Sequence, residues 1–154
     1  MGALSVNLCG IELDNPVIPA SGTFGYGLEF SELYDINILG TFSFKGTTKE
    51  PRFGNPTPRI AECPSGMLNA VGLQNPGVCE VKKDILPKLS EIFHKKVMAN
   101  IGGFSESEYV YVCEMLDDCE QIGWFGQIML DKFNVKLNKQ QLEAVQSVER
   151  PTLL

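Results

Sequence analysis

Four short polar stretches of this 154-residue sequence carry side chains that could bind a flat, partly charged ring. Lys45 supplies a cation that suits a carboxylate, a phosphate or the electron-rich side of a flavin ring. Asn69 and Asn100 each offer one carbonyl and one amide, which suits a ring with mixed donors and acceptors. Ser21-Gly22 allows the backbone to approach such a ring closely. A solvated lysine and two ordinary turn asparagines are the alternative interpretation.

Three of these stretches end predicted strands. In residues 38–48 polar and apolar residues alternate, which puts Lys45 on the face opposite Phe42 and Phe44. Ligands of parallel sheets and barrels lie at the carboxyl ends of the strands, so three polar strand ends indicate one site. Small residues also end many strands that border no site, and this pattern alone leaves both interpretations open. The strands are PVIPASG at 16–22, ILGTFSFKGTT at 38–48 and KVMANIGG at 96–103.

Helical patterns lie between these strands. Residues 28–34 have apolar positions at helical spacing, and residues 78–93 predict one helix or two with a kink near Pro87. Ser105 begins a capping box that opens an amphipathic helix of about 14 residues. A β-hairpin around Gly10 precedes all of them. This order predicts an α/β fold with parallel strands and crossover helices.

The composition excludes several classes of protein. A net charge of −6 gives no electrostatic reason to bind nucleic acid or an anionic membrane. No apolar run approaches the roughly 20 residues that span a bilayer, and no secretory signal is recognisable. Five cysteines without a C-x-x-C motif indicate reduced thiols in the cytoplasm and no metal site. The single histidine, His94, is expected on the surface without a chemical role.

Residues 55–77, NPTPRIAECPSGMLNAVGLQNPG, form an unusually long stretch without a helical pattern. Loops of this length in compact domains are usually functional or disordered. Apolar residues are too frequent here for disorder, so we expect an ordered, functional loop.

The segments NPVIPASGTFGYG, FKGTTKEPRFGNPTPRIAECPSGMLNAVGLQNPG and VMANIGG together resemble the catalytic subunit of class 1B dihydroorotate dehydrogenases, over about residues 4–123. The resemblance implies a partial TIM (β/α)₈ barrel, with about three and a half βα units after the hairpin. It implies FMN-dependent oxidation of dihydroorotate to orotate in pyrimidine biosynthesis. It also implies a partner subunit that carries FAD and an iron–sulfur cluster and passes electrons to NAD.

The same resemblance implies roles for individual residues. The loop at 55–77 would form a small strand-rich excursion over the barrel mouth and hold the substrate. FMN would contact Ser21, Gly22, Lys45, Gly46, Thr47 and Asn100. The substrate would contact Lys45 and the run Asn69, Ala70, Val71, Gly72 and Leu73.

Other family motifs are absent from this sequence. The family's base is a cysteine in a loop reading like N-x-S-C-P-N, and no cysteine here has that context, so no catalytic residue is assigned. A second active-site lysine and the glycine-rich turns that hold the FMN phosphate are also absent. A general base typically contributes 10²–10⁴-fold, so we expect no turnover by this chain alone. Because the turns that hold the phosphate are missing, we also expect weak FMN binding. A non-enzymatic half-barrel interaction module, which could pair edge to edge as a homo-oligomer, or a non-functional fragment is the alternative.

The C-terminal segment gives a different pattern. We predict a boundary after residue 123, with 124–154 as an unrelated tail that contains a short helix. Within it KLNKQQLEAVQSVERPTLL, at 136–154, weakly resembles the opening of DNA helicases that begin with a glutamine motif. No nucleotide-binding loop follows in the sequence.

Overall fold

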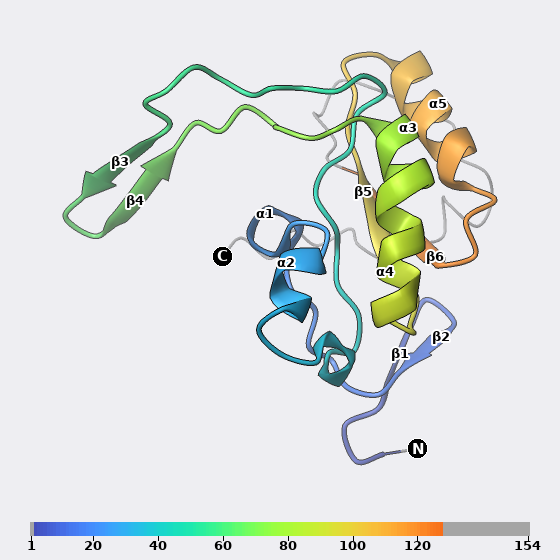
Figure 1. The fold of residues 1–154 in the computed structure, drawn as a ribbon. Coiled ribbons are helices and arrows are strands. Elements are labelled where there is room, and N and C mark those ends of the chain that lie inside the picture. The colour runs from blue at the N-terminus through green and yellow to red at the C-terminus, as the bar shows by residue number, and fades with distance from the viewer. Residues whose placement is uncertain (1, 128–154) are drawn as a thin grey trace.

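A computed structural model describes residues 2–127 of the chain (Figure 1). The predicted tail helix and the helicase-like stretch at 136–154 lie outside the described residues. The division of the chain into domains 1–123 and 124–154 therefore stays a prediction. A strand, β6 (Ile122–Gln127), crosses the proposed boundary.

The chain opens with the predicted hairpin. Strands β1 (Val6–Leu8) and β2 (Ile11–Leu13) pair antiparallel, with Val6 opposite Leu13. Cys9 and Gly10 form the turn, both with positive φ, at 49° and 88°. Positive φ at both central positions is the geometry that matches the twist of a two-residue hairpin.

Parallel pairing joins the central segments, as the sequence order predicts. Strand β5 (Val97–Ile101) pairs with β6 on one side. On its other side it pairs with the segment 42–47 through two parallel bridges, Ser43–Met98 and Thr47–Ile101. The segment 38–48 therefore has the predicted position, although it forms separate bridges in place of one continuous strand.

The strand expected at residues 16–22 is wrong. Its backbone carbonyls do accept hydrogen bonds, from Gly40 N–H to Val17 (3.2 Å) and from Ser43 N–H to Pro19 (3.1 Å). Proline has no N–H, so Pro16 and Pro19 cannot return such bonds and no regular ladder forms.

The helices follow the sequence pattern with shorter bounds in places. Helix α1 (Ser21–Phe24) was not predicted, and α2 (Leu28–Ser31) ends before residue 34. A 3₁₀ turn, η1, follows at Ile36–Ile38. Residues 78–92 form one helical run of three parts, α3 (Val78–Glu80), the π-helical η2 (Val81–Ile85) and α4 (Leu86–Ile92).

A π-helical turn lies just before Pro87, where the sequence predicts a break or kink. Pro87 lies in the first turn of α4 and has no N–H to donate to the turn before it. A widened turn at this point is one of the recognised ways in which a helix accommodates such a break.

Helix α5 (Glu106–Leu116) has the predicted cap. The Ser105 hydroxyl accepts a hydrogen bond from Glu108 N–H at 3.3 Å, and the Glu108 carboxylate accepts one from Phe104 N–H at 2.7 Å. The apolar face named by the sequence pattern is buried. Its members are Tyr109, Val112, Cys113 and Leu116.

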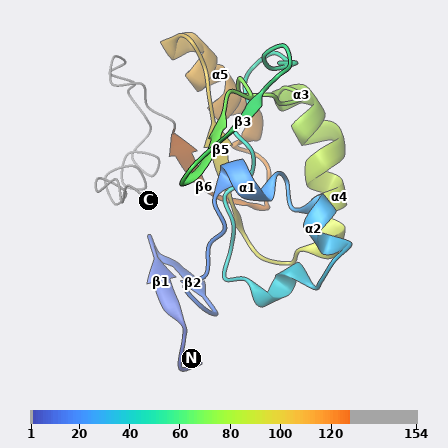
Figure 2. The ribbon, with the colours of Figure 1, turned by 90° about the vertical axis from the view of Figure 1, so that its left-hand side faces the viewer.

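The core fills the space between the β5–β6 sheet and helices α3, α4 and α5, which lie on the same side of the sheet in both views (Figures 1 and 2). Phe42, Phe44 and Leu89 are fully buried there. Parallel strands covered by crossover helices make this an α/β fold and part of a (β/α)₈ barrel. No helix within residues 2–127 is long and apolar enough to cross a membrane.

The long loop forms a hairpin arm, which we define as residues 52–75. It contains β3 (Ile60–Cys63) and β4 (Gly66–Asn69), an antiparallel pair in which Ile60 lies opposite Asn69. The arm extends sideways, away from β5 (Figure 1). All residues of both strands are exposed.

Candidate functional site

Ser21 and Asn100 meet at the carboxyl end of β5. The Asn100 amide donates a hydrogen bond of 2.5 Å to the Ser21 hydroxyl, which joins the first residue of α1 to the strand end. Asn100 is only 8% exposed, and burial of an amide side chain requires such a partner. Two of the predicted FMN contacts are thus neighbours although they are far apart in the sequence.

The segment Lys45-Gly46-Thr47 lies beside the same strand end. Thr47 N–H donates to the Asn100 carbonyl (2.9 Å), and the Thr47 carbonyl accepts from Gly102 N–H (2.8 Å). The Thr47 hydroxyl contacts the Lys45 carbonyl at 2.9 Å. Gly46 and Thr47 are buried, and Lys45 is half-buried.

Lys45 differs from the paired lysines of the molecule. Among residues 2–127 the ion pairs are Lys82–Asp118, Lys88–Asp84 and Lys95–Asp14, and none includes Lys45. A half-buried lysine without a carboxylate partner among these residues can take an anionic ligand as its counter-ion.

The loop that follows β4 reaches this end of the sheet at Leu73. A side-chain carbon of Leu73 lies 3.3 Å from the position that a β-carbon on Gly102 would occupy. A larger residue at position 102 would therefore press against Leu73. Gly72 and Leu73 are half-buried, as is Val71.

Two of the remaining predicted contacts are not brought to the strand ends, and a third, Gly22, directly follows Ser21 in the chain. Asn69 and Ala70 are exposed on the hairpin arm, which extends away from β5 (Figure 1). Gly22 is exposed, with no atom within 4 Å of the position that a β-carbon would occupy. The structure thus gathers Ser21, Asn100 and the segments 45–47 and 72–73.

Sequence reasoning missed two polar groups that support this region, Tyr26 and Asn75. The Tyr26 hydroxyl lies 3.0 Å from the Thr47 hydroxyl, and Tyr26 is 9% exposed. Burial raises the pKa of Tyr26 to about 12, although its hydrogen bond with Thr47 acts in the opposite direction. Asn75, in the turn-like sequence QNPG, is also buried. Neither residue has a pattern that would distinguish it from a core aromatic or a turn residue.

Alkaline pH should destabilise the folded chain through Tyr26. The pKa of this phenol is near 10 in the unfolded chain and about 12 in the folded one. Its contribution is therefore complete below pH 10 and is lost as pH rises toward 12, by about 1.4 kcal/mol per pH unit. Burial raises the pKa of Cys113 from 9.0 to about 11. This thiol therefore adds a loss of stability that begins at a lower pH.

Urea unfolding at about pH 8.5 and about pH 11 measures this effect. We expect Tyr26→Phe to be about 1 kcal/mol less stable at the lower pH, where it lacks the bond to Thr47, and to lose less on the change to higher pH. Equal losses for the variant and the parent would contradict the assignment.

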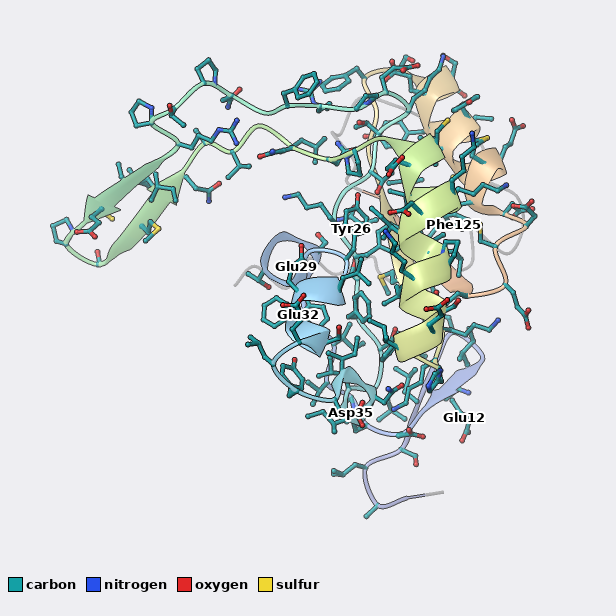
Figure 3. The ribbon with its side chains drawn as sticks, in the orientation of Figure 1. Glu12, Tyr26, Glu29, Glu32, Asp35 and Phe125 are labelled. Atoms are coloured by element: carbon teal, nitrogen blue, oxygen red, sulfur yellow. The ribbon has the colours of Figure 1, made fainter. Side chains whose placement is uncertain are left out.

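A cavity of about 470 Å³ lies at the other end of β5. It is lined by parts of β2, the end of α4 and the segment before β5, including Leu13, Phe93 and Lys95. Lys95 is held there by Asp14 at 2.7 Å. Figure 3 shows Glu12, another lining residue, at the hairpin end and Tyr26 toward the end from which the arm leaves. The amino end of barrel strands generally serves stability, so this cavity is not the candidate site.

Comparison with known proteins gives consistent matches. The family model described as dihydroorotate dehydrogenase matches residues 3–150, which extends past the predicted boundary at residue 123. The catalytic subunit of dihydroorotate dehydrogenase B (NAD(+)) from Geobacillus kaustophilus is 51% identical over 122 residues, or 79% of this chain and 39% of that protein. The corresponding subunit from Streptococcus pneumoniae is 54% identical over 110 residues, 71% of this chain and 35% of that protein.

A solved structure matches the fold. The crystal structure of ligand-free dihydroorotate dehydrogenase from Eimeria tenella superposes with a TM-score of 0.63 at 21% identity, over 80% of this chain and 37% of that one. This chain spans about two fifths of the length of the curated relatives that it matches.

Proposed function

Because the chain belongs to the dihydroorotate dehydrogenase family, we propose that its strand ends form part of a site for FMN-dependent oxidation of dihydroorotate to orotate in pyrimidine biosynthesis. The observation that carries this proposal is the half-buried Lys45, which has no carboxylate partner in the described part of the chain. It lies beside the joined Ser21 and Asn100 at the carboxyl end of β5.

The residues at this end have the chemistry that FMN requires. A hydroxyl, an amide and an ammonium can bind the polar edge of a flat ring, and the open backbone at Gly22 allows the ring to approach closely. When bound, FMN would accept a hydride from the substrate. We assign Ser21, Gly22, Lys45, Gly46, Thr47 and Asn100 to the cofactor.

The proposed substrate contacts come from two separate parts of the chain, Lys45 and the run from Asn69 to Leu73. Lys45 can attract the carboxylate of dihydroorotate, and the Leu73 side chain lies close enough to Gly102 for the Gly72-Leu73 segment to border the same space. Asn69, Ala70 and Val71 would take part only if the arm bends toward the strand ends when ligand binds. No proton-abstracting base is assigned within this chain.

The names of the relatives support a partner subunit. They are named as catalytic subunits of an NAD(+)-type enzyme. We propose that this chain is cytoplasmic and that it has a partner subunit that carries FAD and an iron–sulfur cluster and passes electrons to NAD.

Titration of FMN into the purified chain, followed by flavin fluorescence, tests the proposal. We expect a saturable change in fluorescence that orotate modifies, because the ring would leave water for a site beside Lys45. Fluorescence that stays linear in FMN concentration up to the millimolar range would contradict it.

A second candidate function is a non-enzymatic interaction module. The hairpin arm exposes large apolar side chains, which marks an interaction surface in many proteins. Sedimentation velocity tests it, and a stable dimer that binds no FMN would favour it over the first candidate. The exposed residues are Phe53, Ile60, Met67 and Leu68.

A further inference from the structure

The root of the hairpin arm is fastened by one buried amide, Asn75, which is 6% exposed. Its side-chain oxygen accepts hydrogen bonds from Thr48 N–H and Gly77 N–H, each at 3.0 Å. Its side-chain nitrogen donates to the Leu73 carbonyl at 2.8 Å and to the Thr48 hydroxyl at 3.0 Å. One side chain thus binds the segment that enters the arm, the loop that leaves it and the start of α3.

The bond to Leu73 holds an unusual backbone. Leu73 has a φ of 54°, in the left-handed region that a leucine rarely adopts, and Gly72 before it has a φ of 82°. Such conformations persist only where the surrounding contacts enforce them, and they are frequent at ligand sites. Asn75 N–H and the Arg52 carbonyl, at 3.1 Å, add a backbone bond at the same place.

The other bonds of Asn75 reach the candidate site. Thr48 follows Thr47 directly, and Thr47 is tied to Asn100 and Gly102 by backbone hydrogen bonds of 2.9 and 2.8 Å. The Asn75 side chain therefore sets the distance between the Gly72-Leu73 backbone and the segment 45–47. The oxygen and the nitrogen of the Asn75 side chain are both hydrogen-bonded to protein groups, so Asn75 has no hydrogen-bonding capacity left for a ligand.

We propose that Asn75 is a positioning residue that fixes the Gly72-Leu73 backbone against Lys45 and thereby determines affinity for a planar carboxylate substrate, while leaving FMN affinity nearly unchanged. The inference rests on the proposed function. FMN would be held mainly by Ser21, the segment 45–47 and Asn100, which are also fastened to β5 and to one another by hydrogen bonds that do not include Asn75.

Asn75→Asp is the decisive variant. The carboxylate keeps the two acceptor bonds to Thr48 and Gly77 and loses both donor bonds, so Leu73 is released. Asn7→Asp is the matched control, because it adds the same charge on the exposed N-terminal hairpin, where the side chain accepts a hydrogen bond from Gly10 N–H that aspartate can also accept. Thr48→Val is a second test, since it removes the hydroxyl that accepts a hydrogen bond from the Asn75 amide and adds no charge.

Two readouts separate positioning from a general loss of structure. Orotate and FMN affinities are measured by flavin fluorescence, and hydrogen exchange is measured at residues 70–77. For Asn75→Asp we expect orotate to bind about tenfold more weakly, FMN to bind within about twofold of the parent, and exchange at Leu73 to accelerate. Thr48→Val should change orotate affinity in the same direction by less, and Asn7→Asp should change neither affinity.

The inference is overturned if Asn75→Asp leaves orotate affinity unchanged, or if orotate and FMN affinities fall by the same factor. A parent chain that binds FMN but shows no effect of Asn75→Asp refutes the positioning role alone. A parent chain that binds neither ligand refutes the proposed function, and the ligand-positioning role fails with it even if exchange shows that Asn75 holds the loop.

Discussion

Lys45→Met is expected to weaken FMN binding by about 10- to 100-fold while leaving the fold intact. Methionine has a similar length and no charge, so the change removes the positive charge of the half-buried Lys45, which has no protein counter-ion among residues 2–127. Hydrogen bonds to charged groups contribute about 1.5–3 kcal/mol, which corresponds to the expected factor. Flavin fluorescence titration measures the loss directly.

Lys88→Met is the matched control for this prediction. Lys88 lies on α4 and pairs with Asp84 four residues earlier, at an exposed position away from the strand ends. An exposed pair of this kind contributes little, so FMN affinity and stability should stay close to those of the parent. Similar effects of both substitutions on FMN affinity would mean that Lys45 acts only through net charge.

Phe42→Ala is expected to lower the free energy of unfolding by about 3–5 kcal/mol. Phe42 is fully buried, and its ring centre lies 4.9 Å from that of Phe24 and 5.1 Å from that of Phe93. Its removal leaves a cavity between the first helices and α4. Since a small domain has a free energy of unfolding of only about 5–15 kcal/mol, this loss would remove a large share of its stability.

Urea unfolding followed by circular dichroism measures this loss. Phe53→Ala is the control, because Phe53 is the same residue type and is 86% exposed on the arm. We expect less than about 0.5 kcal/mol for that change. A loss below about 1 kcal/mol for Phe42→Ala would show that the core around Phe42 is not packed as described.

The parts of the fold that were predictable depend on local patterns. Phe42 and Phe44, which the alternation puts on one face, are both fully buried, although Thr41 on the other face is fully buried too. The run before Asn100 correctly predicts a parallel strand. Ser105 correctly marks the start of α5, because a capping serine accepts a hydrogen bond from the backbone N–H three residues later, and this signal is local in the sequence.

The parts that were not predictable depend on contacts between distant segments. The two prolines in 16–22 are compatible with an edge strand, and only the absence of returned N–H bonds shows that none forms. The role of Asn75 requires knowledge that Thr48, 27 positions earlier, lies beside it. The direction of the arm also has no signal in the sequence, because an exposed two-stranded hairpin is compatible with many orientations.

The site that we propose at the carboxyl ends of the strands is tested most directly by ¹⁵N NMR of the chain during titration with FMN. The account predicts that the amide signals of Ser21, Gly22, residues 45–47 and Asn100 shift together and saturate at one FMN concentration. Shifts confined to the cavity at the opposite end, around His94 and Lys95, or no saturable shift at all, would contradict it.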